Sequence, residues 1–299
     1  MVLKAMIITN NSNIIKMRIA KGTLLIIIIS GTLACSTVKF TEKSISDEQR
    51  KAFFPRSEIK PALIPEKEKI WVFVMAGQSN MAGRGLVEPK DTIPSERILT
   101  INRHGEIVIA KEPLHFYEPE LTGLDCGMSF ARTIIANAPS DVSVLMLPVA
   151  VGGSSISQWL GDSLYRNVKL LTNFREKTEI GQQYGNIKAI LWHQGESDAN
   201  SRDLPLYSER IATLTAIFRD IAGDNNLPVL LGELGSYSAD PENWEGINLQ
   251  IRKYSATDPL SAVIGTSDLK EKGDKIHFNS RSQRKMGRRF AEGFLEITK

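Results

Sequence analysis

Cysteine and histidine are scarce in this chain of 299 residues, which has two cysteines, Cys35 and Cys126, and four histidines. Two cysteines so far apart form neither a CxxC pair nor a structural zinc cluster. His193 and Glu196 share one short segment, but no third ligand accompanies them, so we expect no metal and no other cofactor. Aromatic residues make up 7% and hydrophobic residues 42% of the chain. These values are typical of a globular protein and argue against a disordered, collagen-like or disulfide-stapled chain.

A large excess of charge of one sign is also missing. The formal net charge is +3, yet Lys4, Lys16, Arg18 and Lys21 lie within residues 1–35, which contain no acidic side chain. The remaining residues therefore carry a net charge of −1. Because nucleic-acid binding depends on basic side chains that neutralise phosphates, this balance argues against a nucleic-acid partner.

The apolar run 22–34 has 13 residues, whereas a helix that spans a membrane needs about 20. A basic segment before the run and small residues after it are typical of a secretory signal. The run ends in TLACS, which resembles a bacterial lipobox with Thr32 where leucine is usual. We therefore expect a signal peptide over residues 1–35, lipidation of Cys35, and a location in the bacterial periplasm or cell envelope. Membrane contact would be through that lipid alone; the alternative is an unlipidated signal peptide with a cysteine nearby.

The rest of the chain divides into two parts. Residues 36–69 mix charges with prolines and show no sustained period, which indicates a linker. From residue 70 onward, short apolar runs alternate with helical patterns. Runs that are apolar on both faces are typical of parallel strands covered by helices on both sides. Residues 70–299 are thus expected to form one α/β domain, a three-layer α/β/α sandwich with a mainly parallel five-stranded sheet. The expected strands are 70–75, 142–149, 187–192, 227–231 and 262–266, and the expected helices are 127–137, 204–221, 244–255 and 280–294.

Polar residues follow these strands where ligands bind in such sheets, beyond the carboxyl ends. Ser79 follows the first strand and could be a nucleophile if a base reaches it. Gly152 and Gly153 follow the second, and their backbone N–H groups could stabilise an oxyanion. Each feature alone also has an ordinary structural reading, as a helix cap or a turn between strand and helix.

Two further loops complete the set. Gln194 and Glu196 follow the third strand and offer an amide N–H and a carboxylate. Near the C-terminus, His277 is the natural base for Ser79, and Asp274 is placed to orient its imidazole. Taken alone, His277 could equally be a surface histidine.

The combination resembles the SGNH/GDSL hydrolase superfamily, in particular its carbohydrate-esterase branch of family 6 acetylxylan esterases and sialate O-acetylesterase-like proteins. The motifs that carry the resemblance are GQSNMAGRG (77–85), GMSFA (127–131), VGGSSISQW (151–159), WHQGESD (192–198), GELG (232–235) and GDKIHFNSRSQRKMGRRFAE (273–292). The resemblance implies a flavodoxin-like SGNH fold in which Ser79 is the nucleophile, His277 the base and Asp274 its partner. Glu196 remains a second candidate for orienting the histidine.

The same resemblance implies an oxyanion hole made by the N–H of Ser79, a glycine N–H at Gly153 and the side-chain amide of Gln194. Gln194 stands where the wider superfamily has asparagine, and the choice between Gly152 and Gly153 stays open. The implied activity is a serine esterase that removes O-acetyl groups from carbohydrates through an acetyl-serine intermediate. Acetylated xylan, other glycans and sialic acid are all open as substrates.

Arg84, Trp159 and Trp244 are candidates for contact with the sugar, since aromatic rings suit the apolar faces of sugars. Either tryptophan could equally belong to the core. Two other functions stay open: a lipase or thioesterase that acts on short acyl esters, and a catalytically silent glycan-binding lipoprotein. The complete set of a nucleophile, a base and oxyanion donors favours the esterase. The oligomeric state is not readable from the sequence.

Overall fold

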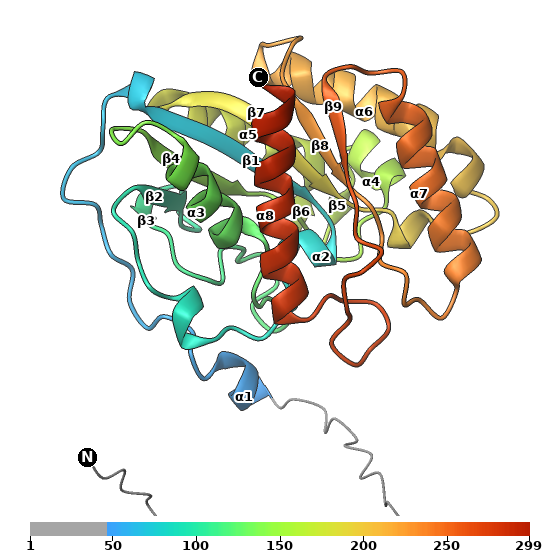
Figure 1. Ribbon diagram of the computed structural model, residues 1–299, viewed down its shortest axis with the longest axis horizontal. Coiled ribbons are helices and arrows are strands. Elements are labelled where there is room, and N and C mark those ends of the chain that lie inside the picture. Colours follow the sequence, from blue (N-terminus) through green and yellow to red (C-terminus); the bar gives the residue numbers. More distant parts are fainter. Residues whose placement is uncertain (1–46) are drawn as a thin grey trace, which may run out of the picture. The chain divides into compact units, whose positions relative to one another are not determined.

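The computed structural model describes residues 47–299, and a seven-stranded sheet runs through this part of the chain (Figure 1). The strand order is β3-β2-β4-β1-β7-β8-β9, and every neighbouring pair is parallel except β2 and β3. The strands are β1 (Ile70–Gly77), β2 (Ile98–Ile101), β3 (Ile107–Ile109), β4 (Ser143–Pro148), β7 (Asn186–His193), β8 (Val229–Gly232) and β9 (Ser261–Ile264). The predicted mainly parallel α/β sheet is confirmed.

The expected number of five strands is wrong, because β2 and β3 extend the sheet beyond β4. These strands are only four and three residues long, and they form an antiparallel pair. A tight turn joins them, with Gly105 at a φ of +79°. Two apolar runs on either side of a polar, glycine-containing turn are a recognised hairpin signal. That signal would have located both strands.

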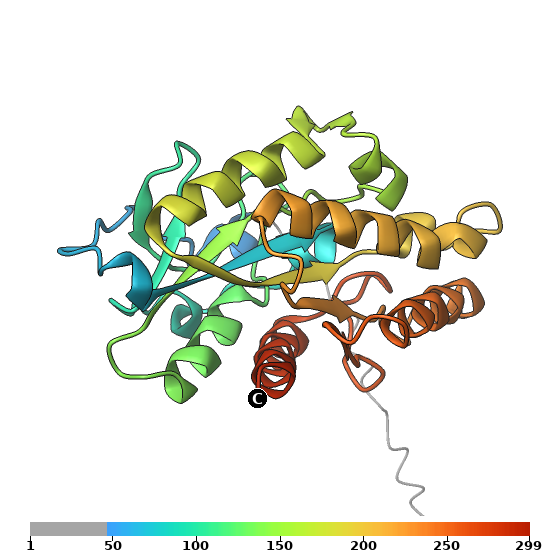
Figure 2. The ribbon, with the colours of Figure 1, turned by 90° about the horizontal axis from the view of Figure 1, so that it is seen from above.

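Helices cover both faces of the sheet (Figure 2). One face carries α3 (Gly127–Asn137) and α8 (Ser280–Ile297), and the other carries α5 (Leu170–Tyr184) and α6 (Tyr207–Ala222). A further helix, α7 (Pro241–Ser255), packs beside α6 and β9. The helix α5 was not expected from the sequence: the buried residues on its inner face include Asn173, Thr178 and Gly181, which blur the apolar stripe.

Shorter elements lie mostly at the ends of strands. They are α1 (Asp47–Lys51), α2 (Ser79–Ala82), α4 (Ile156–Leu160), the hairpin of β5 (Leu164–Tyr165) and β6 (Val168–Lys169), and single 3₁₀ turns at Lys67–Lys69, Pro89–Asp91, Glu196–Asp198 and Leu204–Leu206. The helix α2 begins directly at Ser79. Ser79 therefore lies at the carboxyl edge of the sheet, just after the end of the central strand β1.

The alternation of side chains along β1 builds the two halves of the core. Val72 and Val74 join the cluster under α5 and α6, while Phe73 and Met75 join the cluster under α3 and α8. Phe73 packs edge-on against Phe294 of α8, with ring centroids 5.0 Å apart. Since β1 is buried on both faces, its sequence is one continuous apolar run. Truncation of a side chain such as Phe73 to alanine would lower the free energy of unfolding by about 3–5 kcal/mol.

The end of the predicted linker lies against this domain. Arg50 of α1 donates hydrogen bonds to the carbonyl oxygens of Glu120 and Thr122. Further along, the carbonyl of Ile59 accepts the outward N–H of Ile109 on β3, at 2.8 Å. Within residues 47–299, no helix is both long and apolar enough to cross a membrane. The predicted signal peptide and Cys35 fall outside the described residues.

Candidate active site

Three of the predicted residues meet at the carboxyl edge of the sheet. Ser79 Oγ, at the start of α2, lies 2.9 Å from Nε2 of His277, which stands in the loop before α8. The other ring nitrogen of His277, Nδ1, lies 2.7 Å from Oδ2 of Asp274. The side chains of Ser79, His277 and Asp274 thus form one chain of contacts, although 198 positions separate the serine from the histidine.

Asp274 is held by its own loop. Its Oδ1 accepts the backbone N–H groups of Ile276 at 3.0 Å and of His277 at 2.8 Å, and Nζ of Lys272 lies 3.0 Å from Oδ2. Partial burial alone would raise the pKa of Asp274, but hydrogen bonds from the side chain and backbone of His277 and from Lys272 hold that pKa well below its usual range. The carboxylate therefore stays charged beside the imidazole.

The two glycines of the next loop differ in what their N–H groups do. The N–H of Gly152 donates to Oε2 of Glu118 at 2.6 Å, so it is already engaged. For Gly153, which has a φ of +82°, the hydrogen bonds formed among residues 47–299 include none from its N–H. An unpartnered N–H at a left-handed glycine suits an anion-binding role, and Gly153 is the better candidate of the two.

Gln194 is placed differently from the prediction. Its side chain is fully buried, and Nε2 donates to Oδ2 of Asp198 at 2.6 Å and to Oε1 of Gln78 at 3.0 Å. The hydroxyl of Tyr207 donates to its Oε1 at 2.9 Å. Because an amide nitrogen has two hydrogens, both are committed within the protein. In this arrangement Gln194 ties loops together, and its part in an oxyanion hole stays a prediction.

Glu196 forms neither a hydrogen bond nor an ion pair with His277. Its Oε1 accepts a hydrogen bond from Nδ2 of Asn80 at 2.7 Å, while its Oε2 is buried with no hydrogen-bond partner among the described residues. The neighbouring His193 is fully buried, its Nε2 lies 2.9 Å from the carbonyl oxygen of Glu233, and burial lowers its pKa. Within residues 47–299, no cluster of three or more histidine, cysteine or acidic side chains is suited to hold a metal ion.

The three residues predicted to contact the sugar are buried. Trp159 is completely buried against Trp192, and its Nε1–H donates to Oγ of Ser154 at 2.9 Å. Trp244 is 6% exposed and packs in the core beside α6. Arg84 is 9% exposed and pairs with Glu118 at 2.9 Å. Both tryptophans lie in the core, which was the alternative left open for them by the sequence.

Two residues on the β5–β6 hairpin lie close to the site instead. A Cβ on Gly153 would lie 2.9 Å from the hydroxyl of Tyr165 and 3.8 Å from Nη2 of Arg166. The side chain of Arg166 is 42% exposed, and its Nη1 lies 2.7 Å from Oε1 of Glu118. Arg166 also stacks over the ring of Tyr165, 5.8 Å from its centroid. Only the folded chain brings this hairpin to Gly153, so sequence spacing gave no indication of it.

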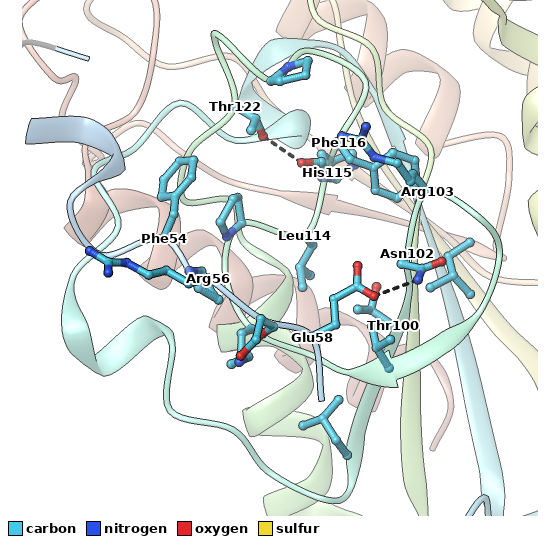
Figure 3. A pocket seen from close by; sticks show the side chains of 18 residues that line it. Phe54, Arg56, Glu58, Thr100, Asn102, Arg103, Leu114, His115, Phe116 and Thr122 are labelled. Carbon is cyan, nitrogen blue, oxygen red and sulfur yellow. Dashed lines mark hydrogen bonds between the residues drawn. The ribbon is translucent and has the colours of Figure 1, made fainter. Parts of the chain in front are cut away.

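A cavity of about 390 Å³ lies elsewhere, between residues 54–58 and the β2–β3 end of the sheet (Figure 3). Phe54, Phe116 and His115 line it, and Glu58 accepts a hydrogen bond from Nδ2 of Asn102 at its wall, at 2.9 Å. Ser79, Gly153 and His277 are absent from the lining. The cavity is thus separate from the candidate active site.

A serine, a histidine and an aspartate in hydrogen-bond contact at the carboxyl edge of a doubly wound sheet form the arrangement that serine hydrolases use. A family model described as "Carbohydrate esterase, sialic acid-specific acetylesterase" matches residues 69–296, and the chain belongs to this family. The protein is a carbohydrate O-acetylesterase. The resemblance inferred from the sequence motifs is confirmed at the level of the family.

Individual relatives agree with this assignment. A protein of Arabidopsis thaliana described as a probable carbohydrate esterase is 27% identical over 261 residues, which cover 80% of this chain and 94% of the relative. The X-ray structure of the Arabidopsis protein has a TM-score of 0.67 at 24% identity and covers 76% of this chain and 98% of its own. The crystal structure of NanS has a TM-score of 0.64 at 18% identity and covers 79% of this chain and 99% of its own. These structural likenesses show a shared fold.

Proposed function

We propose that the protein removes acetyl groups from sugar hydroxyls through an acetyl-serine intermediate on Ser79. The observation that carries the proposal is the unbroken contact from Ser79 Oγ through His277 to Asp274, at 2.9 Å and 2.7 Å. A serine hydroxyl is a weak nucleophile by itself, and a base within hydrogen-bond reach activates it. The geometry supplies that base, and Asp274 supplies the charge that stabilises the resulting imidazolium.

In the first half of the reaction, Ser79 Oγ attacks the acetyl carbonyl carbon while Nε2 of His277 takes the hydroxyl proton. The N–H groups of Ser79 and Gly153 stabilise the oxyanion that develops; loss of one such donor typically costs about 100- to 1000-fold in rate. The imidazolium then protonates the departing sugar oxygen, and the bond between that oxygen and the acetyl carbon breaks. The acetyl group remains on Ser79.

In the second half, a water molecule attacks the acetyl-serine while His277 takes one of its protons. The second tetrahedral intermediate collapses as His277 returns its proton to Ser79 Oγ, and the product leaves as acetic acid, which loses its remaining proton to solvent water. Every proton moves between Ser79, His277, water and the sugar. The side chains of Ser79 and His277 therefore account for the proton transfers of the whole cycle.

For the substrate, we propose an O-acetylated sugar that carries a carboxylate, as sialic acid does. The family description names sialic acid. The exposed guanidinium of Arg166, close to Gly153, supports a negatively charged sugar over neutral xylan. The ring of Tyr165 beside it offers an apolar face to the sugar.

A substrate panel tests this function. We expect acetate release from O-acetyl sialic acid and from p-nitrophenyl acetate, weaker release from acetylated xylan, and little from long-chain acyl esters. Ser79→Ala is expected to abolish release from every substrate while the fold persists. A preference for long acyl chains would favour the lipase alternative, and a wild-type protein that binds glycans without releasing acetate would favour the silent lipoprotein.

The N-terminal sequence supports a separate proposal, that the protein is exported and anchored by a lipid on Cys35. The support is the basic segment, the apolar run 22–34 and the TLACS sequence. Mass spectrometry of the N-terminus of protein from membrane fractions tests it. A cleaved, lipidated Cys35 is expected, with Cys35→Ser releasing the protein from the membrane; an uncleaved N-terminus would contradict both export and anchoring.

A further inference from the structure

We propose that Asn80 positions the catalytic base His277, and that Glu196 contributes to catalysis only by orienting Asn80. This inference rests on the proposed function, in which His277 is the base. It assigns a role to the carboxylate of Glu196, which lies near the site and forms no hydrogen bond or ion pair with the histidine. One oxygen of this carboxylate is buried without a hydrogen-bond partner among the described residues.

Asn80 holds both chain neighbours of His277. Its Nδ2 donates to the carbonyl oxygen of Ile276 at 3.1 Å, and its Oδ1 accepts the N–H of Phe278 at 3.0 Å. These two residues flank the histidine on either side. A single amide group therefore fixes the backbone from which the imidazole projects toward Ser79.

The same residue is tied firmly to the nucleophile. Asn80 follows Ser79 directly in α2, is 1% exposed, and accepts a hydrogen bond on its backbone oxygen from Nε2 of Gln283 in α8, at 2.9 Å. The side chain of Asn80 thus joins the helix that carries the nucleophile to the loop that carries the base. A displacement of about 1 Å between such groups can cost about 100-fold in rate.

Glu196 determines which way the amide of Asn80 faces. An ionised carboxylate only accepts hydrogen bonds, and its Oε1 lies 2.7 Å from Nδ2 of Asn80. The nitrogen must therefore face Glu196 and Ile276, which leaves the oxygen for the N–H of Phe278. If the amide were reversed, its oxygen would meet the carboxylate and its NH₂ would meet the N–H of Phe278. Glu196 thus acts together with the backbone groups of Ile276 and Phe278 to exclude that orientation.

A direct role for Glu196 as the partner of the histidine is the competing explanation. Nδ1 of His277 is already 2.7 Å from Asp274, and the contact made by Glu196 is with Asn80. The two explanations differ in one measurable respect. If Glu196 acts through Asn80, its removal has no further effect once Asn80 is gone.

A double-mutant cycle on the full protein tests this dependence, with p-nitrophenyl acetate as the substrate. We expect Asn80→Ala and Glu196→Ala each to lower kcat by about 10- to 100-fold with KM nearly unchanged, because the base is misplaced while the binding surface remains. The double variant is expected to equal Asn80→Ala alone. A further loss of tenfold or more in the double variant would overturn the proposal.

Conservative substitution gives a second readout that a merely structural role would not produce. Glu196→Gln retains an oxygen that accepts from Asn80, so we expect kcat within about threefold of wild type. If the charge itself were needed beside the histidine, Glu196→Gln would be as impaired as Glu196→Ala, and the proposal would fail. This comparison also decides the matter if Asn80→Ala does not fold.

Two controls separate the possible failures. Glu292→Ala removes an exposed carboxylate of α8 and is expected to keep wild-type kinetics. Thermal unfolding of each variant shows whether the fold persists. If Ser79→Ala or His277→Ala retained activity, the proposed function itself would be wrong, whereas normal kcat in Glu196→Ala and Asn80→Ala would overturn only the positioning role.

Discussion

The two loops that carry the site motifs, residues 274–277 and 194–198, use their polar groups in opposite ways. In the first, Asp274 and His277 are partly exposed, and the imidazole faces Ser79. In the second, Gln194 and Asp198 are fully buried and bond to each other at 2.6 Å. Both loops follow strands or precede helices at the same edge of the sheet, and both contain residues typical of catalysis.

The difference teaches that a catalytic-looking motif can have a structural task. Every hydrogen of the Gln194 amide is engaged inside the protein, and burial raises the pKa of Asp198 despite the N–H of Ile156 and the amide of Gln194 that it accepts. In the 194–198 loop, Gln194 and Asp198 thus bond to groups inside the protein. The 274–277 loop keeps Nε2 of His277 in contact with Ser79 Oγ, as the proposed mechanism requires.

The largest expected effect concerns the reactive loop. Asp274→Asn removes the charge that orients and stabilises the imidazole, and we expect kcat to fall by about 10⁴-fold, as in the serine-protease case. Glu196→Gln should cost no more than about threefold. Steady-state kinetics on p-nitrophenyl acetate, with circular dichroism to verify folding, measures both. A larger loss for a well-folded Glu196→Gln would reverse the assignment of the two carboxylates.

The next largest effect concerns the supporting loop. Gln194→Ala would leave Asp198 and Gln78 without the donor that they now share, and we expect a loss of about 3 kcal/mol in the free energy of unfolding. Urea unfolding measures this loss. The matched control Gln182→Ala removes one partly buried hydrogen bond, to the carbonyl of Ala222, and should cost about 1 kcal/mol. If Gln194→Ala had normal stability and a kcat about 100-fold lower, the result would instead support a role for Gln194 in the oxyanion hole.

A smaller effect is expected at the hairpin beside Gly153. Arg166→Ala should raise KM for O-acetyl sialic acid about threefold, as expected for the loss of one partly exposed charged contact, and leave KM for p-nitrophenyl acetate unchanged. Arg175→Ala, which removes an exposed arginine of α5, is the control and should change neither value. Equal changes in KM for both esters would show that Arg166 does not recognise the sugar.

The smallest expected effect is the dependence of folding stability on pH. The pKa of Asp274 in the folded protein is held below that of an unfolded aspartate. The carboxylate therefore favours the folded state above about pH 4, and this contribution is lost as the pH falls below that value. The difference in urea midpoint between wild type and Asp274→Asn should thus shrink from pH 7 to pH 3. A difference that stays constant would show that the charge of Asp274 does not stabilise the fold.

The sequence predicted those parts of the protein that a short stretch of residues determines by itself. The apolar run of β1 and its end before Ser79 indicated the candidate nucleophile, the motif around His277 indicated the candidate base, and the two side chains lie in hydrogen-bond contact. It could not show that Trp159 is covered on every side, because burial depends on α5 and α6, which pack against it from distant parts of the chain. Nor could it show which acceptors take the hydrogens of Gln194, since Gln78 lies 116 positions away.

The contact of Ile59 with β3 affects how the protein behaves among its own copies. β3 is an edge strand of the sheet, and such edges tend to pair with the edges of other molecules. The carbonyl of Ile59 occupies one outward N–H of this edge. A shortened protein that begins at Ile70, where the predicted domain begins, would keep every catalytic residue but uncover β3. We therefore expect such a shortened protein to be less soluble than one that keeps Ile59, because an outward N–H of β3 is then open to another molecule.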